Sequence, residues 1–294
     1  MLDHHADGES LPERIVVVGS HSFVGKALLS RLEARGAAVL ALGRADIDLA
    51  QDDAAQRLAG LIRPTDAVVA IAAKAPCRNA DDFLVNAHII RSFATALKAS
   101  KPAHIVNISS DAVYGDEPLP LRESNTAAPG SMHGAMHLAR EIAFRDLGLP
   151  LAILRPTLLY GAADPHNGYG PNQFRRKANA GEEIVLFGEG EERRDHIDVA
   201  DVAEIAARVL MRRSTGVLNV ASGTVASFLE IAQQAARIAG KPVSIRGRSR
   251  VGPMPHNGYR PFDPAATFAA FPDFKYTSLE AGMARAQATE FSIG

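Results

Sequence analysis

Near its start the chain reads Ile15-Val-Val-Val-Gly-Ser-His-Ser-Phe-Val-Gly25, four β-branched residues followed by a glycine-bearing turn. The apolar run predicts a strand that is buried on both faces, as strands of parallel sheets are. Gly19 permits a tight turn, and Gly25 lets the next helix pack close to the sheet, so that the helix start offers free N–H groups to a pyrophosphate. We therefore expect a dinucleotide-binding turn, with Ser22 where a middle glycine is usual. The alternative is a glycine turn that serves only the geometry of a helix start.

Outward from this turn, strand-length apolar runs alternate with helix-length segments. Strands are expected at 15–18, 39–42, 67–71, 105–108 and 151–154, and helices at 24–35, 52–62, 82–99, 134–147, 172–180, 200–212 and 227–239. This rhythm predicts an α/β fold with a Rossmann-type, doubly wound parallel sheet. We expect residues 1–13 to form a flexible tail and residues 14–160 the dinucleotide-binding domain. Residues 161–294 are then a smaller, mainly substrate-binding part that is interleaved with the Rossmann core.

Composition and charge exclude several classes of protein. The 294 residues contain 32 Lys and Arg against 33 Asp and Glu, a formal charge of −1, so no basic field exists to hold nucleic acid. The single cysteine, Cys77, excludes a disulfide scaffold and a multi-cysteine metal site. No apolar run reaches the roughly 18 residues of a membrane span, and the polar start does not read as a signal peptide. We expect a cytoplasmic protein that binds neither nucleic acid nor membrane.

Four motifs carry a resemblance to a known family. They are the glycine turn, Ser109-Ser-Asp-Ala-Val-Tyr-Gly115, Leu154-Arg-Pro-Thr-Leu-Leu-Tyr-Gly161 and Arg194-Asp-His-Ile-Asp-Val-Ala-Asp-Val202. From about residue 14 to 285 the chain resembles the extended short-chain dehydrogenases/reductases, which include NAD(P)-dependent epimerases, dehydratases and reductases of sugar nucleotides. Leu158 departs from the pattern, since the family usually has Asn there. The resemblance implies a nicotinamide cofactor and a nucleotide-sugar substrate, and we expect a homodimer.

The expected cofactor contacts follow the first strands. They are Gly19, Ser22, Phe23, Val24, Gly25, Arg44, Asp48, Leu49, Ala72, Ala73, Asn86 and Pro156. Arg44 ends the second strand, where NAD-selective relatives often place an acid on the adenosine ribose; an arginine there can pair with a 2′-phosphate. NADP is therefore favoured over NAD. The alternative is that Arg44 is a solvated surface side chain.

The catalytic Tyr-x-x-x-Lys of the resembled family is altered in this chain. The best match to its Tyr-Gly-x-Ser-Lys-Leu-Ala-x-Glu is His133-Gly-Ala-Met-His-Leu-Ala-Arg-Glu141, which puts His133 at the Tyr position and His137 at the Lys position. Ser110 matches the family's catalytic serine, and Asp111 follows it, whereas Ala112 replaces the Glu of dehydratases. Imidazole exchanges protons near neutrality, so activity should follow a group that titrates near about 6–7. The alternative is a histidine pair that only packs on a helix face.

Substrate contacts are expected from the C-terminal part of the chain. They are Asn172, Phe174, Arg194 and Arg260. The resemblance implies that the two arginines hold the pyrophosphate, which a guanidinium can bind bidentately. The alternative is that Arg193 and Arg194 only pair with Glu191 and Glu192.

Two further patterns give no ligand site. The pentapeptide Pro-His-Asn-Gly-Tyr occurs at 165–169 and again at 255–259, without a repeat period around it. His166, His196 and His256 lie in separate loops without metal-ligand spacing, so no metal is expected.

Together these features predict hydride transfer at a carbon of a nucleotide-linked sugar, by a 4-keto reductase or an epimerase. Two alternatives stay open. The chain could be a silent binder that kept the pocket after losing Tyr and Lys, or a nicotinamide enzyme on a non-sugar substrate, in which Arg194 would be dispensable.

Overall fold

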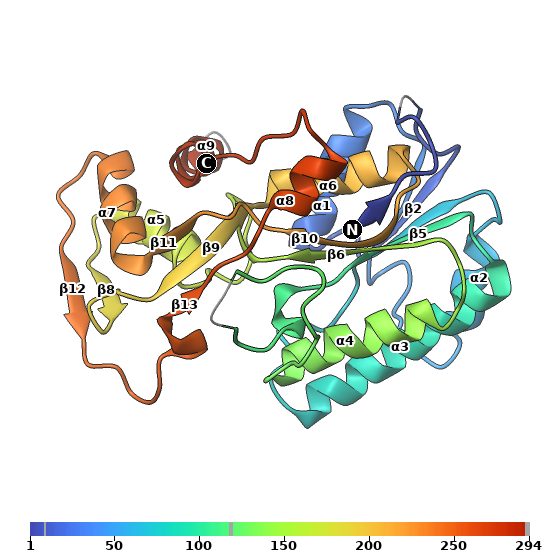
Figure 1. Ribbon diagram of the computed structural model, residues 1–294, viewed down its shortest axis with the longest axis horizontal. Coiled ribbons are helices and arrows are strands. Elements are labelled where there is room, and N and C mark those ends of the chain that lie inside the picture. Colours follow the sequence, from blue (N-terminus) through green and yellow to red (C-terminus); the bar gives the residue numbers. More distant parts are fainter. Residues whose placement is uncertain (9, 118–119, 292–294) are drawn as a thin grey trace.

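A seven-stranded sheet forms the centre of the computed structural model, which describes residues 1–8, 10–117 and 120–291 (Figure 1). Its strands, in the spatial order β1-β10-β6-β5-β4-β2-β3, are β1 (Leu2–Asp3), β10 (Thr215–Val220), β6 (Leu151–Pro156), β5 (His104–Ile108), β4 (Ala67–Ala70), β2 (Ile15–Val18) and β3 (Val39–Leu42). Every neighbouring pair is parallel except β1 with β10. The strand order changes direction between β2 and β4, the crevice where doubly wound sheets bind ligands. The expected Rossmann-type fold is confirmed.

Helices cover both faces of this sheet (Figure 1). On one face lie α1 (Phe23–Glu33), α6 (Val199–Met211) and α8 (Ala265–Ala270), and on the other α2 (Ala54–Leu61), α3 (Ala80–Ser100) and α4 (Met132–Arg145). Ile15 and Val17 of β2 pack into the core beneath α1 and α6, whereas Val16 and Val18 pack toward α2 and α3. Successive strand residues point to opposite faces, so a strand covered on both faces is apolar without alternation.

The start of the chain corrects one expectation. Residues 1–13 do not begin as a flexible tail, because Leu2 and Asp3 pair with β10 as an antiparallel edge strand. His4 then anchors this segment, with Nδ1 at 2.7 Å from Ser214 Oγ and Nε2 at 3.0 Å from the Ala270 carbonyl. The polar composition of this segment predicted a flexible tail, yet its histidines make specific contacts.

A smaller part, containing two further sheets, lies beside the main one (Figure 1). In one, β9 (Arg193–Asp198) pairs with β7 (Leu158–Tyr160), β11 (Val225–Ser227) and β13 (Tyr259–Arg260); in the other, β8 (Ile184–Phe187) pairs with β12 (Ile245–Arg248). Helices α5 (Pro171–Ala180), α7 (Phe228–Ala239) and α9 (Leu279–Phe291) pack together here. Strand β10 and helix α6 follow β9 in the chain yet belong to the main layers, so the two parts are interleaved.

Candidate active site

One cavity of about 1140 Å³ lies at the carboxyl ends of the central strands. Its wall includes most of the side chains that the sequence singles out: Gly19, Ser22, Phe23, Val24, Arg44, Asp48, Leu49, Ala72, Ala73, Ser110, Asp111, His133, His137, Pro156, Arg194 and Arg260. Gly25, Asn86, Asn172 and Phe174 do not line it. The cavity therefore joins the glycine turn to the C-terminal arginines past His133 and His137 of α4.

The glycine turn has the geometry that the sequence predicts. A Cβ on Gly25 would lie 2.3 Å from the Gly19 carbonyl oxygen, and Gly19 itself has φ +100° and would place a Cβ 2.6 Å from Ala72 N. Ser22 replaces the middle glycine by capping α1: its Oγ accepts from Gly25 N at 3.1 Å and donates to the Gly19 carbonyl at 2.7 Å. The first N–H groups of a helix have no intrahelical acceptor, so the start of α1 can hold a phosphate. The cradle fits a dinucleotide.

Arg44 lies at the far end of this cavity. Its side chain is 85% exposed and reaches Asp48 Oδ2 at 3.2 Å. A hydrogen bond from Ala50 N lowers the pKa of Asp48, and the Arg44 contact lowers it further, so this carboxylate is charged. An exposed guanidinium with one carboxylate neighbour can turn toward an adenosine phosphate without losing a buried partner.

Asn86 supports the cavity rather than lining it. Its side chain accepts from Lys74 N at 2.8 Å and donates to the Lys74 and Asp82 carbonyls, both at 2.9 Å. These bonds hold the segment that follows Ala72 and Ala73, so Asn86 stabilises the cavity wall without lining the cavity.

Ser110 and Asp111 begin a short 3₁₀ helix, η1 (Asp111–Val113), beside α4. Ser110 Oγ accepts from Ala112 N at 3.1 Å and donates to Asp111 Oδ1 at 3.4 Å. Helix α4 approaches η1 closely because it has a glycine there: a Cβ on Gly134 would lie 1.9 Å from the Ala112 carbonyl oxygen. The hydroxyl of Tyr114 is bound instead to Asn219 and Arg155 within the protein, and burial raises its pKa.

His133 and His137 lie one turn apart on α4, with their rings edge to face and the centroids 4.7 Å apart. His133 Nδ1 accepts from Cys77 N at 3.4 Å. Burial lowers the pKa of both imidazoles, that of His137 far below its ordinary value, and the charge of Arg140 lowers both further. The lowered pKa of His133 means that activity dependent on this ring should titrate below the ordinary imidazole value, and His137 does not supply the positive charge of the lysine in the resembled family.

The buried positive charge of this helix belongs to Arg140, which the sequence did not single out. It is 1% exposed and donates to the carbonyls of Ala72, at 3.1 Å, and Ile108. Its Nη2 lies 3.5 Å from His137 Nδ1. The position is a variable one in the motif, so no sequence signal pointed to it.

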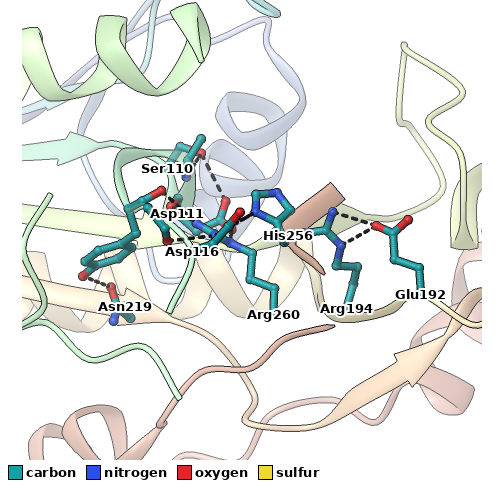
Figure 2. A network of polar contacts seen from close by, with 11 residues as sticks. Ser110, Asp111, Asp116, Glu192, Arg194, Asn219, His256 and Arg260 are labelled. Atoms are coloured by element: carbon teal, nitrogen blue, oxygen red, sulfur yellow. Dashed lines mark hydrogen bonds and ion pairs between the residues drawn. The ribbon is translucent and has the colours of Figure 1, made fainter. Parts of the chain in front are cut away.

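The C-terminal arginines differ in their freedom to bind a ligand. Figure 2 shows Arg260 between Asp111 and Asp116, and Arg194 turned toward Glu192. All five N–H groups of Arg260 have protein acceptors: Asp111 Oδ2, Asp116 Oδ1 and the carbonyls of Asp111, Tyr114 and Gly115. The structure therefore disagrees with a phosphate contact by Arg260. Arg194 lies 2.7 Å from Glu192 Oε1 through Nε and Nη2, which is the pairing expected as the alternative, yet it lines the cavity.

Asn172 and Phe174 are structural in this geometry. Asn172 Oδ1 accepts from Gly161 N at 3.0 Å, and Phe174 is fully buried in the core around Tyr169 and Phe228. Neither lies at the cavity wall, so the expected substrate contacts at these two residues are not seen. The resemblance located the helix correctly but not the direction of its side chains.

The profile of one family, described as the NAD dependent epimerase/dehydratase family, matches residues 15–221. The chain belongs to this family. Among curated epimerase/dehydratase relatives, dTDP-4-dehydro-6-deoxy-D-allose reductase of Streptomyces bikiniensis is 27% identical over 277 residues, covering 79% of this chain and 83% of its own length. UDP-glucose 4-epimerase of Mycolicibacterium smegmatis is 28% identical over 265 residues, with 78% and 83% covered. The solved structure of Thermus thermophilus UDP-glucose 4-epimerase with NAD matches with a TM-score of 0.82 at 23% identity, covering 95% of this chain and 99% of that one.

Membership in the epimerase/dehydratase family confirms the resemblance that the four motifs carry. A nicotinamide cofactor follows from the family and agrees with the cradle at Gly19 and Gly25. Within the described parts of the chain, no group of three or more His, Cys, Asp or Glu side chains is placed to hold a metal ion. No helix in those parts is long and apolar enough to cross a membrane.

Proposed function

We propose that the protein is an NAD(P)-dependent oxidoreductase that transfers hydride at a carbon of a nucleotide-linked sugar, as a 4-keto reductase or an epimerase. The observation that carries this proposal is one continuous cavity, which runs from the phosphate-binding turn past Ser110 and His133 to Arg194. The names of the curated relatives, a dTDP-sugar reductase and a UDP-sugar epimerase, support the substrate class.

A bound nicotinamide donates or accepts the hydride, and the residues of this chain arrange the rest. The start of α1 holds the pyrophosphate, and Asn86 keeps the neighbouring loop in place. Ser110 and His133 offer hydrogen bonds to the reacting oxygen. Arg194 lies at the other end of the cavity, where it can exchange Glu192 for the phosphates of the substrate. We propose NADP rather than NAD, through Arg44.

The silent binder remains the second candidate, because one observation favours it. His137 is neutral and buried, so it cannot supply the positive charge of the lysine that its position suggests. A binder of this kind would hold cofactor and nucleotide without turnover.

Mass spectrometry of ligands released from the purified protein tests the proposal most directly, since it identifies cofactor and nucleotide together. Turnover is then measured with a dTDP-4-keto-6-deoxy sugar and NADPH. Reduction supports the reductase; tightly retained cofactor with interconversion of two sugars supports the epimerase. Bound nucleotide without reaction supports the silent binder. A nicotinamide-dependent reaction on another substrate class contradicts the proposal that the substrate is a nucleotide-linked sugar.

Arg194→Ala tests the sugar-nucleotide end of the cavity. Loss of a charge-assisted contact of about 1.5–3 kcal/mol should weaken nucleotide-sugar binding by about 10- to 100-fold and leave cofactor binding unchanged. Arg193→Ala is the matched control, because that neighbouring side chain is half exposed and faces Glu230. If Arg194→Ala lowers only the melting temperature, Arg194 pairs with Glu192 to stabilise the fold and does not bind the substrate.

We also propose that the protein is a homodimer. Helices α3 and α4 pack side by side and expose large apolar side chains, Leu84 at 61% and Ile142 at 57%. Sedimentation of the parent and of Ile142→Glu would test this, since a monomeric parent contradicts it.

The lone buried cysteine supports a reducing compartment, and we propose that the protein is located in the cytoplasm.

A further inference from the structure

Arg140 has an unusual place for a guanidinium. It lies behind the histidine pair at the carboxyl ends of β4 and β5, the edge of the sheet that carries the cavity. Its hydrogen bonds go to the Ala72 and Ile108 carbonyls, with no carboxylate among its hydrogen-bond partners in the described residues. Burial lowers its pKa to about 10, so it stays cationic at neutral pH. The protein thus keeps a buried positive charge on α4 itself, beside His137.

The hydrogen bonds around the two histidines determine their tautomers. A guanidinium can only donate, so Nη2 of Arg140, 3.5 Å from His137 Nδ1, favours the proton of His137 on Nε2. In the same way Cys77 N donates to His133 Nδ1 and leaves the proton of that ring on Nε2. His133 lines the cavity, so the nitrogen it offers to a ligand there is an N–H donor.

We propose that Arg140 is a positioning residue that, together with the Cys77 backbone N–H, holds His133 as a neutral hydrogen-bond donor, so that the site is built to reduce a carbonyl group rather than to abstract a hydroxyl proton. This inference rests on the proposed function, because it assumes hydride transfer in the same cavity. It favours the reductase over the epimerase, since an epimerase must first remove the proton of a hydroxyl.

The balance of the reduction is simple. A reduced nicotinamide, when bound, would supply the hydride with its bonding pair and become oxidised, and that pair would form a C–H bond at the carbonyl carbon. The π pair of the C=O group becomes a lone pair on oxygen, and the Nε2–H of His133 stabilises this developing alkoxide. Solvent water supplies the proton that completes the hydroxyl. A preorganised donor aimed at a developing oxyanion lowers the barrier without itself changing protonation state.

The charges that face His133 agree with this role. Asp111 of η1 favours the imidazolium, whereas Arg140 of α4 and the burial of the ring oppose it, and His137 beside it is neutral. Cys77 contributes its backbone N–H and a buried thiol. Asp111 is itself paired with Arg260, which weakens its pull on a proton at His133. Removing Arg140 takes away a cation that opposes protonation of both rings.

The first experiment measures the rings directly. In ligand-free protein with ¹⁵N-labelled histidine, NMR should show His133 neutral and protonated on Nε2 between about pH 7 and about pH 8. Arg140→Gln should move its titration to higher pH, and Arg140→Lys, which keeps the charge, should restore it. Arg145→Gln on the same helix is the matched control and should change nothing. A parent ring that is charged, or protonated on Nδ1, overturns the proposal even if Arg140→Gln does not fold.

The second experiment separates this proposal from the proposed function. If His133 is a neutral donor, the rate of ketone reduction is independent of pH over the same range. If an imidazolium gives the proton, the rate falls about tenfold per pH unit above its pKa. That fall overturns the proposal while leaving the proposed function intact. Absence of turnover with the NMR result as expected contradicts the proposed function, and the state of His133 still stands.

Discussion

At the scale of single residues, two histidines stand where the resembled family has tyrosine and lysine, and they do not replace them group for group. His137 is too deeply buried to carry charge, and the cation comes from Arg140 one turn later. The arrangement therefore moves the positive charge along the helix instead of deleting it. Restoring the family pair must take account of that displacement.

His133→Tyr with His137→Lys should consequently not restore activity by itself. The new ammonium would lie beside the Arg140 guanidinium in a buried site, and an uncompensated buried charge costs about 3–5 kcal/mol. We expect the double variant to lose stability, and addition of Arg140→Met to recover it and to raise turnover by up to about 10²–10⁴-fold. Denaturant unfolding and steady-state kinetics on both variants check this. A double variant as stable and as active as the triple variant would show that Arg140 is not a competing charge.

Arg44 leads to a prediction about cofactor choice. Its exposed guanidinium should bind the 2′-phosphate of NADPH, and a contact of about 1.5–3 kcal/mol gives roughly a 10- to 100-fold preference over NADH. Titration of both cofactors against the parent and Arg44→Ala measures it, and the preference should vanish in the variant. Equal affinities in the parent would leave Arg44 as the solvated side chain of the alternative interpretation.

The sequence predicted those site residues whose role depends on local backbone geometry. A turn or a helix cap requires Gly19, Gly25 and Ser110 at their positions. Such local requirements appear as motifs in the sequence. Arg140 was not singled out, and the structural role of Arg260 was not predicted, because their partners are carbonyls and carboxylates far away in the chain. Spacing along a sequence carries no information about such contacts.

At the scale of elements, the 3₁₀ helix η1 is held from two sides. Helix α4 packs against it through Gly134, and β13 reaches it through Arg260 from the C-terminal part. The short η2 (Pro255–Gly258) adds His256, which contacts Asp116 (Figure 2). Ser110 and Asp111 are thus supported partly by segments from the C-terminal part, which was expected to bind the substrate.

The sequence also predicted five strands of the main sheet, because buried parallel strands are continuous apolar runs. It missed β10 and the two-residue edge strand β1.

Arg260→Ala should therefore act on stability. Arg260 is 3% exposed, and its loss removes the donor to Asp111 Oδ2 and to several carbonyls, at a cost of about 3–5 kcal/mol. Turnover should fall with it because Asp111 and Ser110 lose their support. Urea unfolding and binding of a nucleotide diphosphate distinguish the two possible roles. Weaker nucleotide binding with unchanged stability would instead support the expected contact between Arg260 and the substrate phosphates.

At the scale of the whole molecule, buried histidines link the fold to pH. Burial lowers the pKa of His104 to about 4 and that of His196 to about 3, from an ordinary 6.5. Their contribution to stability is full above about pH 6.5 and is lost as the pH falls toward the folded-state values, because only the unfolded chain takes up the protons. Asp195 acts in the opposite sense. Burial raises its pKa to about 6, so its contribution grows as the pH falls from 6 toward 3.8.

These opposing contributions predict a net fall in the free energy of unfolding as the pH is lowered. Between about pH 6 and about pH 5 the unfolded chain binds one proton at each of His104 and His196, and the folded chain binds one at Asp195. Among these three groups the difference of one proton lowers the free energy of unfolding by about 1.4 kcal/mol per pH unit, and the buried His137, whose pKa is also lowered, adds to the loss in the same direction. His196→Leu should reduce the slope by about 1.4 kcal/mol per pH unit, because the ring lies against Phe228 and neither of its nitrogens has a hydrogen-bond partner in the described structure. Urea unfolding of the parent and the variant across this range measures the slope, with the exposed His166→Leu as the matched control. An unchanged slope in His196→Leu would mean that His196 is protonated in the folded protein.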